Sequence, residues 1–141
     1  MFTNENEIHR IGEGLLTCRL PKAEWTHAAH FAAALWLMRY RPDIDPSEDM
    51  PALIRAYNEA TGVRNTDTTG YHETITMASL RAARAWLRYR FDSPLYESLN
   101  ELMASEYGLS TWPLAHWSKP LLFSVVARRS WVEPDLRQLP F

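Results

Sequence analysis

The run His27-Ala-Ala-His-Phe-Ala-Ala-Ala-Leu-Trp-Leu-Met-Arg-Tyr40 is apolar on nearly every side when it is wound into a helix. Alanine and leucine, which dominate it, are strong helix formers. Thr26 precedes the run as an N-cap residue, and Pro42 ends it. Helices that are apolar all round are enclosed by other elements. The sequence therefore predicts a buried central helix over residues 27–40.

The rest of the chain also has helical spacing. Strand signals are scarce, because valine occurs only at positions 63, 125, 126 and 132 and no stretch alternates apolar with polar residues. The Pro-rich residues 133–141 are expected to lie extended. We predict an all-α, single-domain bundle of five or six helices over residues 1–141. Besides the central helix, the expected helices cover about residues 5–18, 47–61 (capped by Ser47), 69/71–90, 94–107 and 118–131.

Composition narrows the class of protein. The 141 residues are 46% apolar, 23% charged and carry a formal net charge of −2, which fits one globular domain and argues against nucleic acid or an anionic membrane as partner. Cys18 is the single cysteine, so no internal disulfide forms. No signal peptide or transmembrane run is visible. We expect a cytoplasmic protein without a membrane or nucleic-acid partner, and self-association into a homo-oligomer stays open.

Four of the five histidines occur near predicted helix starts. His27 and His30 lie in the first turn of the central helix, His72 at the opening of the fourth helix, and His116 just before the sixth. Short connections make successive helices antiparallel, so the N-termini of alternate helices lie at one end of a bundle. The sequence therefore predicts that these four histidines converge.

Such a cluster is typical of a metal centre. Helix N-termini favour neutral imidazole, which binds divalent transition metals and acts as a general base. We expect zinc or iron, with the residues His27, His30, His72 and Glu24 as ligands. His116 and Glu73 are the expected catalytic groups. A metal-free histidine cluster and unrelated structural histidines remain alternatives.

The connection between the third and fourth helices is rich in hydroxyl and amide side chains. Arg64, Asn65 and Asp67 there are candidates to orient a polar ligand beside His72, or else to form a turn network that caps the helix. Thr76 and Ser79 share the helix face of His72, where they would form a polar wall of a pocket, support the histidine or simply face solvent. Other candidate ligand-binding residues are Tyr71, Trp25 and Trp117, although tryptophans are often simply core residues.

Four segments also resemble a family of small uncharacterised bacterial proteins. They are Glu24-Trp-Thr-His-Ala-Ala-His30, Tyr57-Asn-Glu-Ala-Thr-Gly62, Asn65-Thr-Asp-Thr-Thr-Gly-Tyr-His-Glu-Thr-Ile-Thr76 and Trp131-Val-Glu-Pro-Asp-Leu136. The resemblance covers most of the chain from Glu24 onward and implies a complete member of that family. It implies no activity, substrate or cofactor.

Three functions are open on the sequence alone. The first is a metal-dependent enzyme that acts on a small molecule, with metal-bound water or iron-activated dioxygen as the reactant. The second is a metal-free module that binds a small molecule or an anion at the helix N-termini. The third is a helical interaction protein without a pocket.

Overall fold

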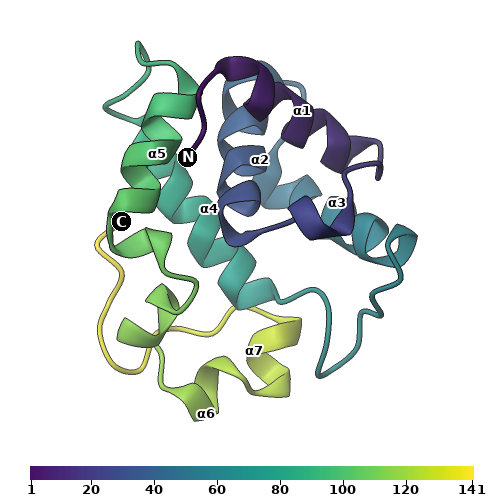
Figure 1. The fold of residues 1–141 in the computed structure, drawn as a ribbon. Helices are drawn as coiled ribbons and strands as arrows, with labels where there is room; N and C mark the ends of the chain where they lie inside the picture. Colours follow the sequence, from purple (N-terminus) through teal and green to yellow (C-terminus); the bar gives the residue numbers. More distant parts are fainter.

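The computed structural model describes residues 1–141 and consists of helices joined by loops, without a strand (Figure 1). This confirms the all-α prediction. Three short 3₁₀ turns are η1 (Lys22–Glu24), η2 (Glu106–Gly108) and η3 (Trp112–Ala115). The α-helices are α1 (Glu5–Leu16), α2 (His27–Tyr40), α3 (Pro46–Ala60), α4 (Glu73–Leu87), α5 (Leu95–Ala104), α6 (Lys119–Leu122) and α7 (Val125–Arg129). None of these helices is long and apolar enough to cross a lipid bilayer.

Helix α2 forms the centre of the bundle and has the bounds expected from the sequence. It contacts α1, α3, α4 and α5, which surround it (Figure 1). All residues from Phe31 to Leu37 are buried. The side-chain hydroxyl of Thr26 accepts the backbone N–H of Ala29 at 3.2 Å and caps the helix. A capped, uniformly apolar segment therefore became the core.

A glycine allows α1 to approach α2 closely. A Cβ atom added to Gly12 would lie 2.2 Å from the ring of Trp36, which no real contact tolerates. The indole N–H of Trp36 donates a hydrogen bond to Nδ1 of His9 at 2.9 Å. Gly12 lowers the helix propensity of α1, but it makes room for the indole at the helix–helix interface.

The start of α4 lies later than expected because the chain first makes a tight turn. Gly70 has a φ of +78°, a conformation that favours glycine. His72 is the N-cap, since its Nδ1 accepts the backbone N–H of Ile75 at 3.2 Å. The first turn of α4 therefore begins at Glu73. Helix α3, in contrast, starts earlier than predicted, with Asp45 and not Ser47 as its cap.

The predicted sixth helix is two short helices, α6 and α7. Ser118 and Ser124 each present an extended backbone and a side-chain oxygen that caps the following turn. A second cap inside an apolar run ends one helix and begins another. The predicted fifth helix is also shorter, because α5 ends at Ala104 and the chain continues as η2.

The C-terminal residues are extended, as expected, and fold back over the short helices. The indole N–H of Trp117 donates to the carbonyl of Val132 at 3.0 Å, and the carbonyl of His116 accepts the backbone N–H of Leu136 at 2.9 Å. The ring of Phe141 lies 5.9 Å from that of Tyr107, so the tail ends near α5 (Figure 1). The tail thus contacts both His116 and Trp117 and the 3₁₀ turn η2.

Candidate functional site

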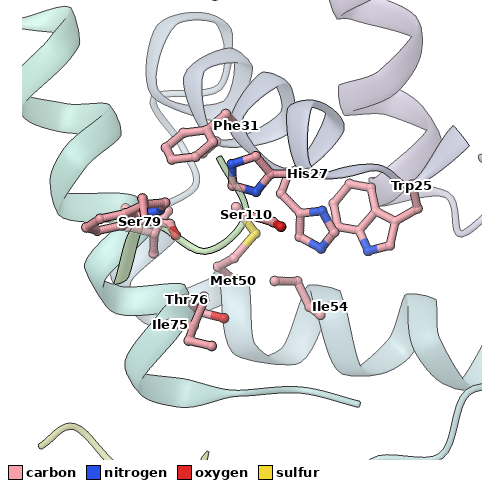
Figure 2. Close-up of a pocket in the computed structure, with 13 residues that line it drawn as sticks. Trp25, His27, Phe31, Met50, Ile54, Ile75, Thr76, Ser79 and Ser110 are labelled. Atoms are coloured by element: carbon pink, nitrogen blue, oxygen red, sulfur yellow. The ribbon is translucent and has the colours of Figure 1, made fainter. Parts of the chain in front are cut away.

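A cavity of about 340 Å³ lies against the N-terminal half of α2, which forms one wall. Helices α3 and α4 and the segment around η3 form the others, and their side chains point toward one another across it (Figure 2). Its volume is within the range of small-molecule sites, about 300–1,000 Å³. The lining residues are Trp25, His27, His30, Phe31, Ala34, Met50, Ile54, Ile75, Thr76, Ser79, Leu80, Ser110 and Trp112.

The walls of this cavity are mostly apolar, and eight of the thirteen lining residues are hydrophobic. No Asp, Glu, Lys or Arg is among them. The polar groups of the lining side chains are the hydroxyls of Thr76, Ser79 and Ser110, the indole N–H groups of Trp25 and Trp112, and two imidazoles. Apolar walls with a few polar groups are typical of sites that bind small organic molecules.

The two imidazoles are held by aromatic neighbours. The ring of His30 stacks on Trp25, with centroids 3.9 Å apart, and the ring of His27 meets Phe31 edge-on at 5.3 Å. Both histidines lie in the first turn of α2. The N-cap at Thr26 therefore also fixes the backbone from which their side chains project. The position of the two rings therefore follows from the start of the central helix.

Each of these two rings donates its N–H to a backbone carbonyl. Nε2 of His27 lies 2.7 Å from the carbonyl oxygen of Tyr107, and Nδ1 of His30 lies 2.7 Å from that of Thr26. A carbonyl oxygen only accepts, so the proton of each neutral ring is on these nitrogens. The other nitrogens, Nδ1 of His27 and Nε2 of His30, carry lone pairs.

Burial keeps His30 uncharged. It lowers the pKa of His30 to about 4, against the smaller opposing effect of the hydrogen bond to the Thr26 carbonyl. At neutral pH this ring is therefore a neutral hydrogen-bond acceptor and a weak base.

The structure does not bring His72 to this cavity. Its Nε2 donates to the carbonyl of Leu122 at 2.7 Å while its Nδ1 caps α4 at Ile75, so both ring nitrogens are used within the protein. Burial lowers the pKa of this histidine. His72 fixes the start of α4 to α6, which is a structural role.

His116 is also separate from the cavity. It is 1% exposed and packs between Trp112 and Trp117. Its Nδ1 donates to the carbonyl of Arg137 at 3.0 Å, and its Nε2 is enclosed without a hydrogen-bond partner. The four histidines therefore do not form one metal-holding group: His27 and His30 line the cavity, while His72 and His116 bond to main-chain carbonyls of α6 and the tail. The broken sixth helix and the returning tail, which a regular alternation of helices does not predict, supply the carbonyls of Leu122 and Arg137 to which His72 and His116 donate.

The two glutamates expected in the site lie outside the cavity. The carboxylate of Glu24 is paired with Arg10 on the surface, and that hydrogen bond lowers the pKa of Glu24. The carboxylate of Glu73 accepts the hydroxyl of Tyr71 at 2.6 Å.

The predicted metal centre does not form as one group in this structure. No three His, Cys, Asp or Glu side chains lie close enough together to hold a metal ion. The set His27, His30, His72 and Glu24 is divided, because His72 caps α4 and Glu24 pairs with Arg10. Zinc or iron binding as such stays a prediction.

The polar loop between α3 and α4 forms the turn network that was the alternative to a ligand role. The Asn65 side chain accepts from Asn58 Nδ2 and from the backbone N–H of Tyr71, both at 3.0 Å. Asp67 pairs with Arg129 of α7 at 2.7 Å, and the Arg64 carbonyl accepts the hydroxyl of Thr69. None of the predicted residues Arg64, Asn65, Asp67 and Tyr71 lines the cavity beside α2, and Asn65, Asp67 and Tyr71 line a smaller one of about 160 Å³ instead.

The remaining predicted ligand-binding residues divide between cavity and core. Trp25 and Thr76 line the cavity. Trp117 is fully buried and belongs to the core, with its N–H on the Val132 carbonyl. Met50 and Ile54 of α3 also line the cavity but were not among the predicted ligand-binding residues. Their spacing of four places them on one face of the helix and was the available signal.

Comparisons of the chain with protein-family models, with curated proteins and with solved structures gave no match. The likeness to small bacterial proteins stays a prediction. The functional argument therefore rests on the cavity and the residues around it.

Proposed function

We propose that this protein binds a small, mainly apolar molecule in the cavity between α2, α3 and α4. The observation that carries the proposal is a cavity of about 340 Å³ whose apolar walls surround two imidazoles with unused nitrogens. Apolar walls that bring together a few polar groups are typical of sites for small organic molecules. The position of this cavity beside the buried helix α2 therefore supports a binding role.

The lining residues indicate the size and polarity of the ligand. Aromatic rings from Trp25, Phe31 and Trp112 suit a flat, aromatic or cyclic molecule, because aromatic pairs gain from stacked and edge-on contacts. Without a charged side chain in the wall, a charged ligand would lose its hydration with no compensating partner. A neutral ring system with a polar substituent fits these walls.

The experiment is a binding measurement with neutral aromatic fragments, followed by ligand-observed NMR. We expect saturable binding at one site in the wild type and its loss in Ser79→Phe, because the new ring fills the cavity from α4. Arg84→Phe is the matched control, since it adds the same ring to an exposed position of α4. Equal binding to both variants, or no binding to the wild type, contradicts the proposal.

One observation favours a metal-dependent form of this function as a second candidate. Metal-binding histidines usually donate their other N–H to a carbonyl or carboxylate, and His27 and His30 both do so. Two imidazoles alone do not complete a metal site, so the substrate would have to supply further ligands. Zinc titration of the purified protein, with His30→Phe as control, tests this candidate: stoichiometric zinc lost in the variant supports it.

A further inference from the structure

We infer that the ligand presents a neutral hydrogen-bond donor, such as a phenol or alcohol O–H or an aromatic N–H, to His27 and His30. This rests on the proposed function and adds to it the chemical class of the ligand. It also separates the two metal-free alternatives that the sequence left open, a small organic molecule and an anion.

The argument begins with the two backbone carbonyls. Because the carbonyls of Tyr107 and Thr26 take the ring protons, the neutral rings of His27 and His30 present acceptors at their remaining nitrogens. Neither ring can reverse this assignment without leaving a carbonyl facing a lone pair. The polarity of this part of the cavity is therefore set by main-chain atoms.

These two nitrogens are accessible to a ligand. Only two side-chain polar atoms are enclosed without a partner in the whole protein, Oγ of Ser98 and Nε2 of His116. The unused nitrogens of His27 and His30 are not among them, and both residues line the cavity. A bound apolar ligand that covers such a nitrogen without donating to it loses about tenfold in affinity per nitrogen.

An anion does not fit the same surface. A carboxylate or phosphate would bring negative charge against two lone pairs, and no Lys or Arg lines the cavity to balance it. A cation finds no carboxylate there either. A neutral donor is the ligand class that pairs with a free ring nitrogen without burying a charge.

Three probes of nearly equal size test the inference, all measured by NMR titration at pH 7 with EDTA present. They are 2-naphthol, which is a donor, 2-methoxynaphthalene, whose oxygen only accepts, and 2-naphthoate, which is an anion. We expect 2-naphthol to bind about tenfold tighter than the ether. The O–H of 2-naphthol satisfies a ring nitrogen that the ether would cover and leave unpaired. The naphthoate should bind more weakly than either.

His30→Phe is the matched variant. Phenylalanine keeps a ring against Trp25 and removes the acceptor, and the Thr26 carbonyl keeps the backbone N–H of residue 30 as a donor at 3.1 Å. The preference for 2-naphthol over the ether should fall to about threefold or less. A circular dichroism spectrum equal to that of the wild type shows that the variant is folded.

A measurement on the wild type itself is independent of any variant. The ¹⁵N spectra of the imidazoles should show that the neutral rings carry their protons on Nε2 of His27 and Nδ1 of His30, and the resonances of the other two ring nitrogens should move when 2-naphthol is added. The opposite tautomers would overturn the inference.

The remaining outcomes separate this inference from the proposed function. If all three naphthalenes bind equally and Ser79→Phe blocks them, the cavity is a binding site and the donor preference is wrong. If 2-naphthol binds only with zinc and not with EDTA, the two nitrogens serve a metal and the inference is overturned. If no probe binds the wild type, the proposed function fails and the inference fails with it.

Discussion

The two pairs of histidines differ in what remains for a ligand. His27 and His30 give one nitrogen each to a carbonyl and leave the other at a cavity. His72 uses both nitrogens within the protein, and His116 is enclosed under the C-terminal tail. All four lie near a turn or helix start, so position in a helix does not distinguish a binding histidine from a structural one. The two kinds of histidine are distinguished by the partner of each ring nitrogen.

The largest expected effect belongs to the structural pair. His72→Ala removes the cap of α4 and the donor to the buried Leu122 carbonyl, so it should lower the free energy of unfolding by about 2–3 kcal/mol. Urea denaturation measures the loss. His30→Phe at neutral pH should cost less than about 1 kcal/mol, since it leaves no enclosed carbonyl unpaired. Equal losses in the two variants would remove the distinction between the pairs.

A smaller effect is expected from the link between α4 and the C-terminal segment. The buried hydroxyl of Thr74 lies 2.7 Å from the Ala127 carbonyl, to which it donates, and accepts the backbone N–H of Val132 at 3.3 Å. Thr74→Val keeps the shape and should lower the free energy of unfolding by about 1–2 kcal/mol. Thr76→Val, in the cavity wall, is the control. A larger loss of unfolding free energy in Thr76→Val than in Thr74→Val would contradict this prediction.

The smallest effect at neutral pH comes from the charge state of His30, and it grows in acid. Its pKa is about 4 in the folded protein and about 6.5 in an unfolded chain, so the unfolded state takes up the proton first. The stability from His30 is present above pH 6.5 and is lost as the pH falls toward 4. Thermal unfolding across this range should show a shallower decline in His30→Phe than in the wild type. Parallel curves would mean that His30 titrates normally in the folded protein.

Local signals in the sequence predicted much of the fold. The bounds of α2 follow from Thr26, the apolar run and Pro42, which act over a few residues. The extended tail follows from its prolines. The break between α6 and α7 and the late start of α4 were missed because Ser124 and His72 act as caps, and their neighbours read equally well as helix.

The candidate site was only partly predictable for a different reason. His27, His30, Trp25 and Thr76 were selected from their spacing and lie at the cavity. His116 instead donates to the carbonyl of Arg137, which lies 21 residues later in the chain and is beside it because the tail folds back. No periodicity in the sequence encodes that contact. Likewise, the ring protons of His27 and His30 are assigned by carbonyls that only the folded structure brings near.

The complete burial of α2 has a consequence for amide hydrogen exchange. Because four helices cover it, the amides of residues 31–37 can reach solvent only when the whole bundle opens, so their exchange rates report the free energy of global unfolding. Helix α7 has five residues and an exposed surface, and its amides should exchange through local opening. A ligand that binds only the native protein slows exchange in α2 by the factor 1 + [L]/Kd. The slowest amides of the chain therefore measure occupancy of the adjacent cavity without any label on the ligand.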